Sequence, residues 1–131
     1  MAPDMVRAYL RDTAALPWQW GVVDCMMWAA SLVERVTGED PAADLRGRYA
    51  DSHSARTIET SAGGALILVT TRLDGILVQD DDAGWGICVS PHDRWGACCG
   101  IVADGRAMLK TDRGLTIDQA RPFAVWRAAD G

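Results

Sequence analysis

The residues best suited to chemistry are an adjacent aspartate and cysteine, Asp24 and Cys25, at the start of an apolar stretch. Apolar residues recur every three or four positions from Cys25 to Val36, which predicts a helix with one buried face. Asp24 is a good N-cap, and Thr37-Gly38 is a good C-terminal stop. The N–H groups and dipole of a helix N-terminus lower the pKa of a thiol and can bind an oxyanion. Cys25 is therefore a candidate nucleophile, although free cysteine on an apolar helix face is also a common core residue.

A thiol nucleophile needs a base, and histidine is the side chain whose pKa suits that task. The chain has two histidines, His53 and His92. His92 follows Pro91 in a predicted turn before a strand, and it is the candidate base if that hairpin folds back toward Cys25. His53 lies between two serines, where a helix-cap neighbourhood explains it more simply. A solvated turn is the simpler explanation of His92 as well.

The remaining periodicities predict helices in the first part of the chain and strands in the second. We expect helices over residues 4–15, 25–36, 54–60 and 65–73, with a short helical turn opening at Asp40-Pro41. An aromatic loop carrying Trp20 and Gly21 links the first two helices. Short apolar runs at 87–89, 97–102, 107–110, 115–117 and 123–126 predict antiparallel strands. This order indicates one α+β domain over residues 1–131.

Composition and charge exclude several classes of partner. The net charge is -5 and no run of Lys or Arg forms a basic patch, so no nucleic acid is expected. No apolar stretch approaches the ~20 residues that span a bilayer, so no membrane insertion is expected. Without a signal-peptide pattern, synthesis in a cytoplasm with free thiols is expected. We expect no cofactor, and no metal, because the alternative zinc set of Cys88, His92 and Cys98 or Cys99 has unsuitable spacing.

A set of short motifs extends along most of the chain. It begins with Trp20-Gly21-x-x-Asp24-Cys25, the helix ending at Thr37-Gly38, and Arg46-Gly47-Arg48-Tyr49. It continues through Gly63-Gly64, Gly84 to Val89, Cys99-Gly100-Ile101, Arg113-Gly114-Leu115 and Ala124-x-Trp126-Arg127. Together these motifs resemble the NlpC-type, papain-like cysteine peptidases. The resemblance covers nearly the whole chain and is greatest for the small versions found in tail gene clusters of phages and gene transfer agents.

The resemblance implies a papain-like fold, with N-terminal helices followed by a small antiparallel sheet. It also implies Cys25 as the nucleophile, supported by Asp24, Trp20 and Gly21, and hydrolysis of peptidoglycan stem peptides by a virion protein at the tail tip. In that family the base opens a His-x-Gly-Ile strand, and the matching residue here is Cys98. The family's Gly-Asp motif is also altered, to Gly84-Trp85-Gly86.

The sequence leaves three functional hypotheses. The first is a tail-tip peptidase in which Cys25 attacks a stem-peptide amide with His92 as base. The second is a catalytically inactive structural component that docks on the tail hub or baseplate, for which an acidic surface and six tryptophans are suitable. The third is a thiol amidase of non-viral origin. Cysteine at position 98 cannot replace an imidazole, so the enzymatic hypotheses require another base.

Overall fold

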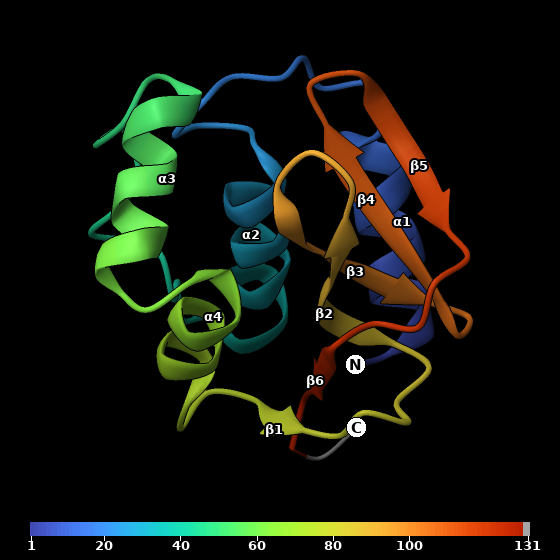
Figure 1. Cartoon of the computed structure of the whole chain (residues 1–131). Helices are drawn as coiled ribbons and strands as arrows, with labels where there is room; N and C mark the ends of the chain where they lie inside the picture. The colour runs from blue at the N-terminus through green and yellow to red at the C-terminus, as the bar shows by residue number, and fades with distance from the viewer. Residues whose placement is uncertain (130–131) are drawn as a thin grey trace.

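The first half of the chain is helical, and the second half forms a sheet (Figure 1). The computed structural model describes residues 1–129, which form four α-helices and one six-stranded antiparallel sheet. The expected α+β class is confirmed. The helices are α1 (Pro3–Thr13), α2 (Cys25–Thr37), α3 (Ser52–Ser61) and α4 (Ala65–Leu73). The strands are β1 (Val78–Gln79), β2 (Gly86–His92), β3 (Gly96–Ala103), β4 (Arg106–Thr111), β5 (Gly114–Asp118) and β6 (Ala124–Arg127).

The sheet has the order β1-β6-β2-β3-β4-β5. Strands β2 to β5 form a meander of consecutive antiparallel pairs, whereas β6 lies between β1 and β2. In the β2–β3 hairpin, Ser90 pairs with Cys98 and His92 pairs with Gly96. His92 is thus the last residue of a strand, directly before the tight turn in which it was expected.

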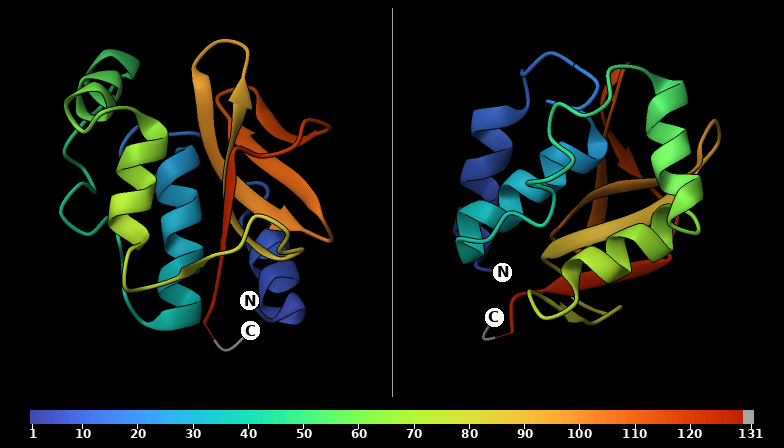
Figure 2. Two further views of the ribbon diagram at one scale, coloured as in Figure 1. Left: turned by 60° about the horizontal axis from the view of Figure 1, so that its bottom comes forward. Right: turned by 90° about the vertical axis from the view of Figure 1, so that its left-hand side faces the viewer.

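Helix α2 packs on the sheet at the centre of the core, chiefly against β3, and α4 lies beside it and contacts β2 and β3 (Figure 2). Its apolar face buries Trp28, Leu32 and Val33 against the sheet. Helix α1 packs in the same core, where the Tyr9 hydroxyl donates to the Trp28 carbonyl at 2.5 Å. The three-and-four spacing therefore identified the buried face of α2 correctly, as the hydrophobic effect requires.

The short helical turn expected at Asp40-Pro41 is present as a single helical bond within the consecutive turns of residues 41–47, from the Arg46 N–H to the Ala42 carbonyl at 3.2 Å. The Asp40 carboxylate accepts bonds from the Ala42 N–H at 3.0 Å and from the Arg46 guanidinium at 2.6 Å. The Gly47 N–H donates to the Gly21 carbonyl at 2.8 Å, which holds this segment against the loop before α2. Strand β1 was not expected, since its two residues are ordered only by pairing with β6.

No helix within residues 1–129 combines the length and the apolar character needed to cross a bilayer.

Candidate functional site

Cys25 is the first residue of α2, and the buried Asp24 carboxylate fixes the chain just before it. One Asp24 oxygen, Oδ1, accepts a bond from the Met27 N–H at 2.9 Å, which is the N-cap interaction expected from the sequence. The other, Oδ2, accepts bonds from the Gly21 N–H at 2.8 Å and the Tyr49 hydroxyl at 2.5 Å. Three donors therefore compensate the burial of this charge, and they join three segments at the start of α2.

Gly21 is required by the close approach of the segment that carries Tyr49. Its φ is 78°, in the left-handed region that favours glycine, and a Cβ there would lie 2.2 Å from the Tyr49 carbonyl oxygen. The preceding Trp20 meets Trp18 edge-on, with ring centroids 4.9 Å apart, and also contacts Trp95 at 5.9 Å. The structure thus brings Trp20 and Gly21 beside Asp24 and Cys25.

A small cleft opens at Cys25, between α3 and the β2–β3 hairpin. We call it the thiol cleft, and it is lined by Trp20, Cys25, Ser52, Ala55, Arg56, Glu59, Trp95 and Ala97. Cys25 is half-buried, so its residue reaches the surface while its thiol is surrounded by protein. The cleft therefore adjoins Cys25, but the sulfur itself is buried.

The surroundings of the Cys25 thiol favour its neutral form. The neighbouring Cys98 side chain, burial and the nearby Asp24 carboxylate together raise the pKa of Cys25 well above its ordinary value. The expected lowering by the helix N-terminus is thus outweighed, because each of these surroundings favours the neutral thiol. Cys98 occupies the strand position in which the NlpC resemblance implies a histidine, and its thiol donates to the Cys99 carbonyl at 3.4 Å.

The two histidines lie elsewhere. The His92 Nδ1 atom accepts bonds from the N–H groups of Arg94 and Trp95, both at 3.2 Å, and its ring stacks on Trp95 at 4.5 Å. His53 is exposed on α3. Within residues 1–129, neither histidine hydrogen-bonds to Cys25. Trp95 contacts His92 and also lines the thiol cleft, and the role of His92 as base stays a prediction.

Comparison with family models gives a match that covers nearly the whole chain. A family model described as a domain of unknown function, DUF6950, matches residues 2–128. The chain belongs to the DUF6950 family. No curated protein and no solved structure gives a significant match. The chemistry of this DUF6950 chain therefore has to be inferred from its own residues.

Glu59 also lines the thiol cleft, although no sequence pattern indicated it. It lies on α3, and burial raises the pKa of its carboxyl group above the usual range. The negative charge of Glu59 also helps to raise the pKa of Cys25. A carboxyl group with a raised pKa beside a thiol can accept a proton nearer neutral pH than an ordinary glutamate can. Sequence spacing does not show which side of a short polar helix faces a cleft.

The part of the DUF6950 chain described by the structure contains no group of three or more His, Cys, Asp or Glu residues placed to hold a metal ion. The alternative zinc set of Cys88, His92 and Cys98 or Cys99 is accordingly not assembled there. Cys88 instead accepts a weak bond from the Ser90 hydroxyl at 3.7 Å inside the sheet, and Cys99 lines an apolar cavity between α2 and α4.

Proposed function

We propose that this chain is a tail-tip component of a phage or gene transfer agent that uses a papain-like, NlpC-type domain as a docking module. In this proposal the domain keeps the nucleophile position at Cys25 but does not hydrolyse peptidoglycan. The observation that carries it is the cysteine at position 98, where the resemblance implies a histidine, together with the raised pKa of Cys25, to which Cys98 and burial contribute most. A thiol pair in the position of a thiol–imidazole pair leaves the cysteine protonated and without a proton acceptor of suitable pKa.

The motif resemblance supports the papain-like assignment and the tail-tip location. The arrangement of the site is compatible with it, since Cys25 begins a helix that packs on a sheet and Cys98 lies on the adjacent strand. The partners of the docking module are proteins of the tail hub or baseplate. Apolar side chains on the outer face of α4 suit such a contact, because Leu66 and Ile67 are 38% and 54% exposed.

The proposal is tested in assembled particles. Cys25→Ala should enter the tail and support infection as the wild type does, because a docking module does not need the thiol. Ile67→Asp should reduce the amount of the chain in purified particles, whereas Ile117→Asp, at an exposed isoleucine on β5, should not. Loss of infection by Cys25→Ala particles of normal composition would overturn the docking function.

A second candidate function is a peptidoglycan peptidase, and the placement of Glu59 favours it. Here Glu59 takes the proton from Cys25, the thiolate attacks a stem-peptide amide, and the N–H groups at the start of α2 bind the oxyanion. Hydrolysis of purified sacculi by the wild type, lost in both Cys25→Ala and Glu59→Gln, would establish this alternative.

A gain-of-function variant separates the two candidates further. If the missing imidazole is what silences the site, Cys98→His should create hydrolysis that the wild type lacks, and Cys25→Ala in the same background should abolish it. Ser90→His provides a matched control, because Ser90 is the residue paired with Cys98 on β2. Hydrolysis by the wild type at the level of Cys98→His would contradict the docking proposal.

A further inference from the structure

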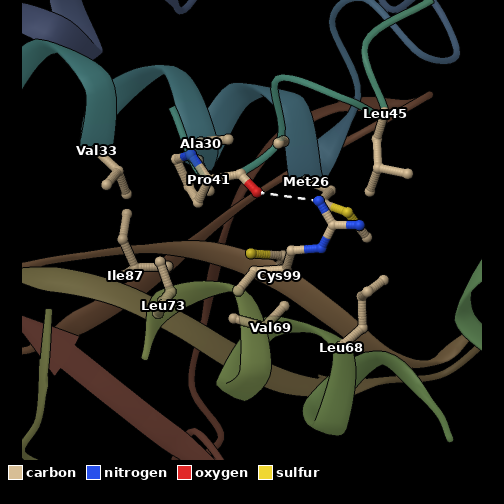
Figure 3. A pocket seen from close by; sticks show the side chains of 13 residues that line it. Met26, Ala30, Val33, Pro41, Leu45, Leu68, Val69, Leu73, Ile87 and Cys99 are labelled. Carbon is tan, nitrogen blue, oxygen red and sulfur yellow. Dashed lines mark hydrogen bonds between the residues drawn. The ribbon is translucent and has the colours of Figure 1, made fainter. Parts of the chain in front are cut away.

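A wide hollow opens on the sheet, away from the thiol cleft. We call it the sheet hollow, and it is lined by residues 91–94, Leu109, Thr111, Arg113 and residues 116–118. Its volume is about 320 Å³, whereas the apolar cavity between α2 and α4 shown in Figure 3 measures about 30 Å³, which is room for about one water. The sheet hollow is therefore large enough to take part of a partner molecule.

The floor of the sheet hollow belongs to the face of the sheet that does not carry α1 and α2. Side chains alternate along β4, and Met108 packs against the core beneath these helices, so Leu109 points to the opposite face. Ala107 shares the face of Leu109, and it packs with Val102 and Val125 in a separate apolar cluster. The sheet hollow is thus distinct from the thiol cleft and from the outer face of α4.

The sheet curls, so that two strands that are not neighbours face each other across the hollow. Strands β3 and β4 separate β2 from β5 in the sheet order. Nevertheless, Pro91 and His92 of β2 line the same hollow as Thr116 and Asp118 of β5. Within residues 1–129, β2 pairs with β3 and β6, and β5 pairs with β4 alone. The curl therefore leaves a gap between the end of β2 and β5.

Strand β5 has an unpaired backbone edge, because it is the last strand of the sheet (Figure 1). In the part of the chain that the structure describes, no backbone bond joins β5 to a segment other than β4. The β4–β5 hairpin closes on the pair Thr111 and Gly114 through a two-residue turn, so the N–H and C=O groups of Leu115 and Ile117 point away from β4. Lysine and proline, which protect many sheet edges, do not occur in Gly114–Asp118.

The lining of the hollow suits an uncharged segment. Leu109 gives its floor an apolar part, and Thr111 and Thr116 add hydroxyl groups. The rim carries two arginines and two aspartates, namely Arg94, Arg113, Asp93 and Asp118. Its formal charge is therefore zero, although the chain as a whole carries a net charge of -5. A neutral segment meets no net charge here, and its small side chains match the floor.

We propose that the sheet hollow binds an uncharged, extended peptide segment of a partner protein, which adds to β5 as an antiparallel strand. The antiparallel sense follows that of all the strand pairs in this sheet. The N–H groups of Leu115 and Ile117 donate to the peptide backbone, and their C=O groups accept from it. Pro91 on the facing wall has no N–H to offer, so the peptide is held from the β5 side. This proposal depends on neither docking through α4 nor hydrolysis.

The pairing predicts that only one backbone edge of the peptide matters. In an antiparallel pair, the peptide residues opposite Leu115 and Ile117 turn their N–H groups toward β5. The residues between them turn their N–H groups away from β5 and their side chains into the hollow. Blocking the first set of N–H groups should therefore abolish binding, whereas blocking the second set should not.

The test is the fluorescence anisotropy of fluorescein-labelled peptides titrated with the full chain. The parent probe carries alternating threonine and valine between Gly-Ser flanks, and two further probes are N-methylated at all threonines or at all valines. The parent should bind saturably. One methylated probe should bind as the parent does, and the other at least about tenfold more weakly, because the lost bonds are those to β5.

Proline substitutions provide the matched test on the protein. Ile117→Pro removes an outward N–H from β5 without removing a bond to β4, so binding of the parent probe should weaken at least about tenfold. Gln79→Pro is the control on the opposite edge of the sheet. The Asp80 N–H donates to the Val125 carbonyl at 2.8 Å, so the N–H of the adjacent Gln79 points outward from β1. Gln79→Pro should bind the probe as the wild type does.

Four results would overturn the proposal. They are a parent probe that does not bind saturably, equal effects of the two methylations, unchanged binding by Ile117→Pro, and a wild-type chain that is dimeric by sedimentation and becomes monomeric in Ile117→Pro. The last result would mean that a second copy of the chain occupies the edge. Circular dichroism spectra show whether each variant is folded, and if Ile117→Pro does not fold, the two methylated probes decide the question with the wild type alone.

Discussion

The hydrogen bond from the Tyr49 hydroxyl to Asp24 should contribute measurably to stability. The bond is 2.5 Å long and lies in the interior, where Tyr49 is 7% and Asp24 is 1% exposed. Burial and the Asp24 carboxylate raise the pKa of Tyr49, so the phenol stays neutral and acts as a donor. Tyr49→Phe keeps the ring and its packing but removes this donor, which leaves a buried carboxylate with one partner fewer.

Tyr49→Phe should lower the free energy of unfolding by about 2 kcal/mol, because hydrogen bonds to charged groups contribute about 1.5–3 kcal/mol to it. With a urea m value of about 2 kcal/mol/M for a domain of this size, the midpoint should fall by about 1 M. Tyr9→Phe is the matched control, because the Tyr9 hydroxyl is equally buried but donates to the neutral Trp28 carbonyl. Its cost should be about 1 kcal/mol.

The measurement is urea unfolding followed by far-ultraviolet circular dichroism, which reports helices and avoids changes in tryptophan fluorescence near the cleft. The two variants should keep the wild-type m value, so that the shift in midpoint reflects free energy alone. The reasoning is refuted if Tyr49→Phe costs no more than Tyr9→Phe. That result would mean that the Gly21 and Met27 N–H groups already compensate the Asp24 charge fully.

Three further predictions follow from the same contacts. Cys98→Ala removes the side chain that contributes most to the raised pKa of Cys25, so the pH profile for alkylation of Cys25 by iodoacetamide should move to lower pH. An unchanged profile would contradict the assigned cause. Gly86→Ala should lower the free energy of unfolding by more than about 4 kcal/mol, because the added Cβ would lie 2.0 Å from a carbonyl oxygen of β6. Thermal unfolding measures this loss, and a variant as stable as the wild type would refute this packing. The raised pKa of Glu59 means that the folded chain holds this proton more tightly than the unfolded chain, so wild-type stability falls as pH rises through the glutamate range. Glu59→Gln should therefore be more stable than the wild type at neutral pH, by less than about 1 kcal/mol for a partly exposed group, and equal to it in acid.

Local signals predicted α2 well. The Asp24 cap, the apolar spacing and the Gly38 stop all act within a few residues, and the helix runs from Cys25 to Thr37 with Gly38 at a φ of 82°. The same holds for the β2–β3 hairpin, whose apolar runs end at a tight turn. Such features depend on short-range sterics and hydrogen bonds, which the sequence displays directly.

The composition of the site depends on contacts between distant residues, and there the sequence was less informative. The motif match marked Cys98 as a substituted position, but its effect on the pKa of Cys25 follows from the packing of α2 on β3. Tyr49 reaches Asp24 only because residues 41–47 turn back across the loop before α2. Glu59 faces the cleft because of how α3 is placed, and its own helix carries no pattern that indicates this side.

The position of β6 in the sheet has a consequence for how the chain folds during synthesis. Strands β2 to β5 pair with their sequence neighbours, so this meander can form as soon as residue 118 has left the ribosome. Strand β1 pairs only with β6, and the outer edge of β2 is also covered by β6. Both edges therefore stay open until residues 124–127 emerge, and closing them carries the entropy cost of a long loop. Nascent chains paused before that point should be the species most prone to aggregate, and insertion of β6 should be the slow step of folding.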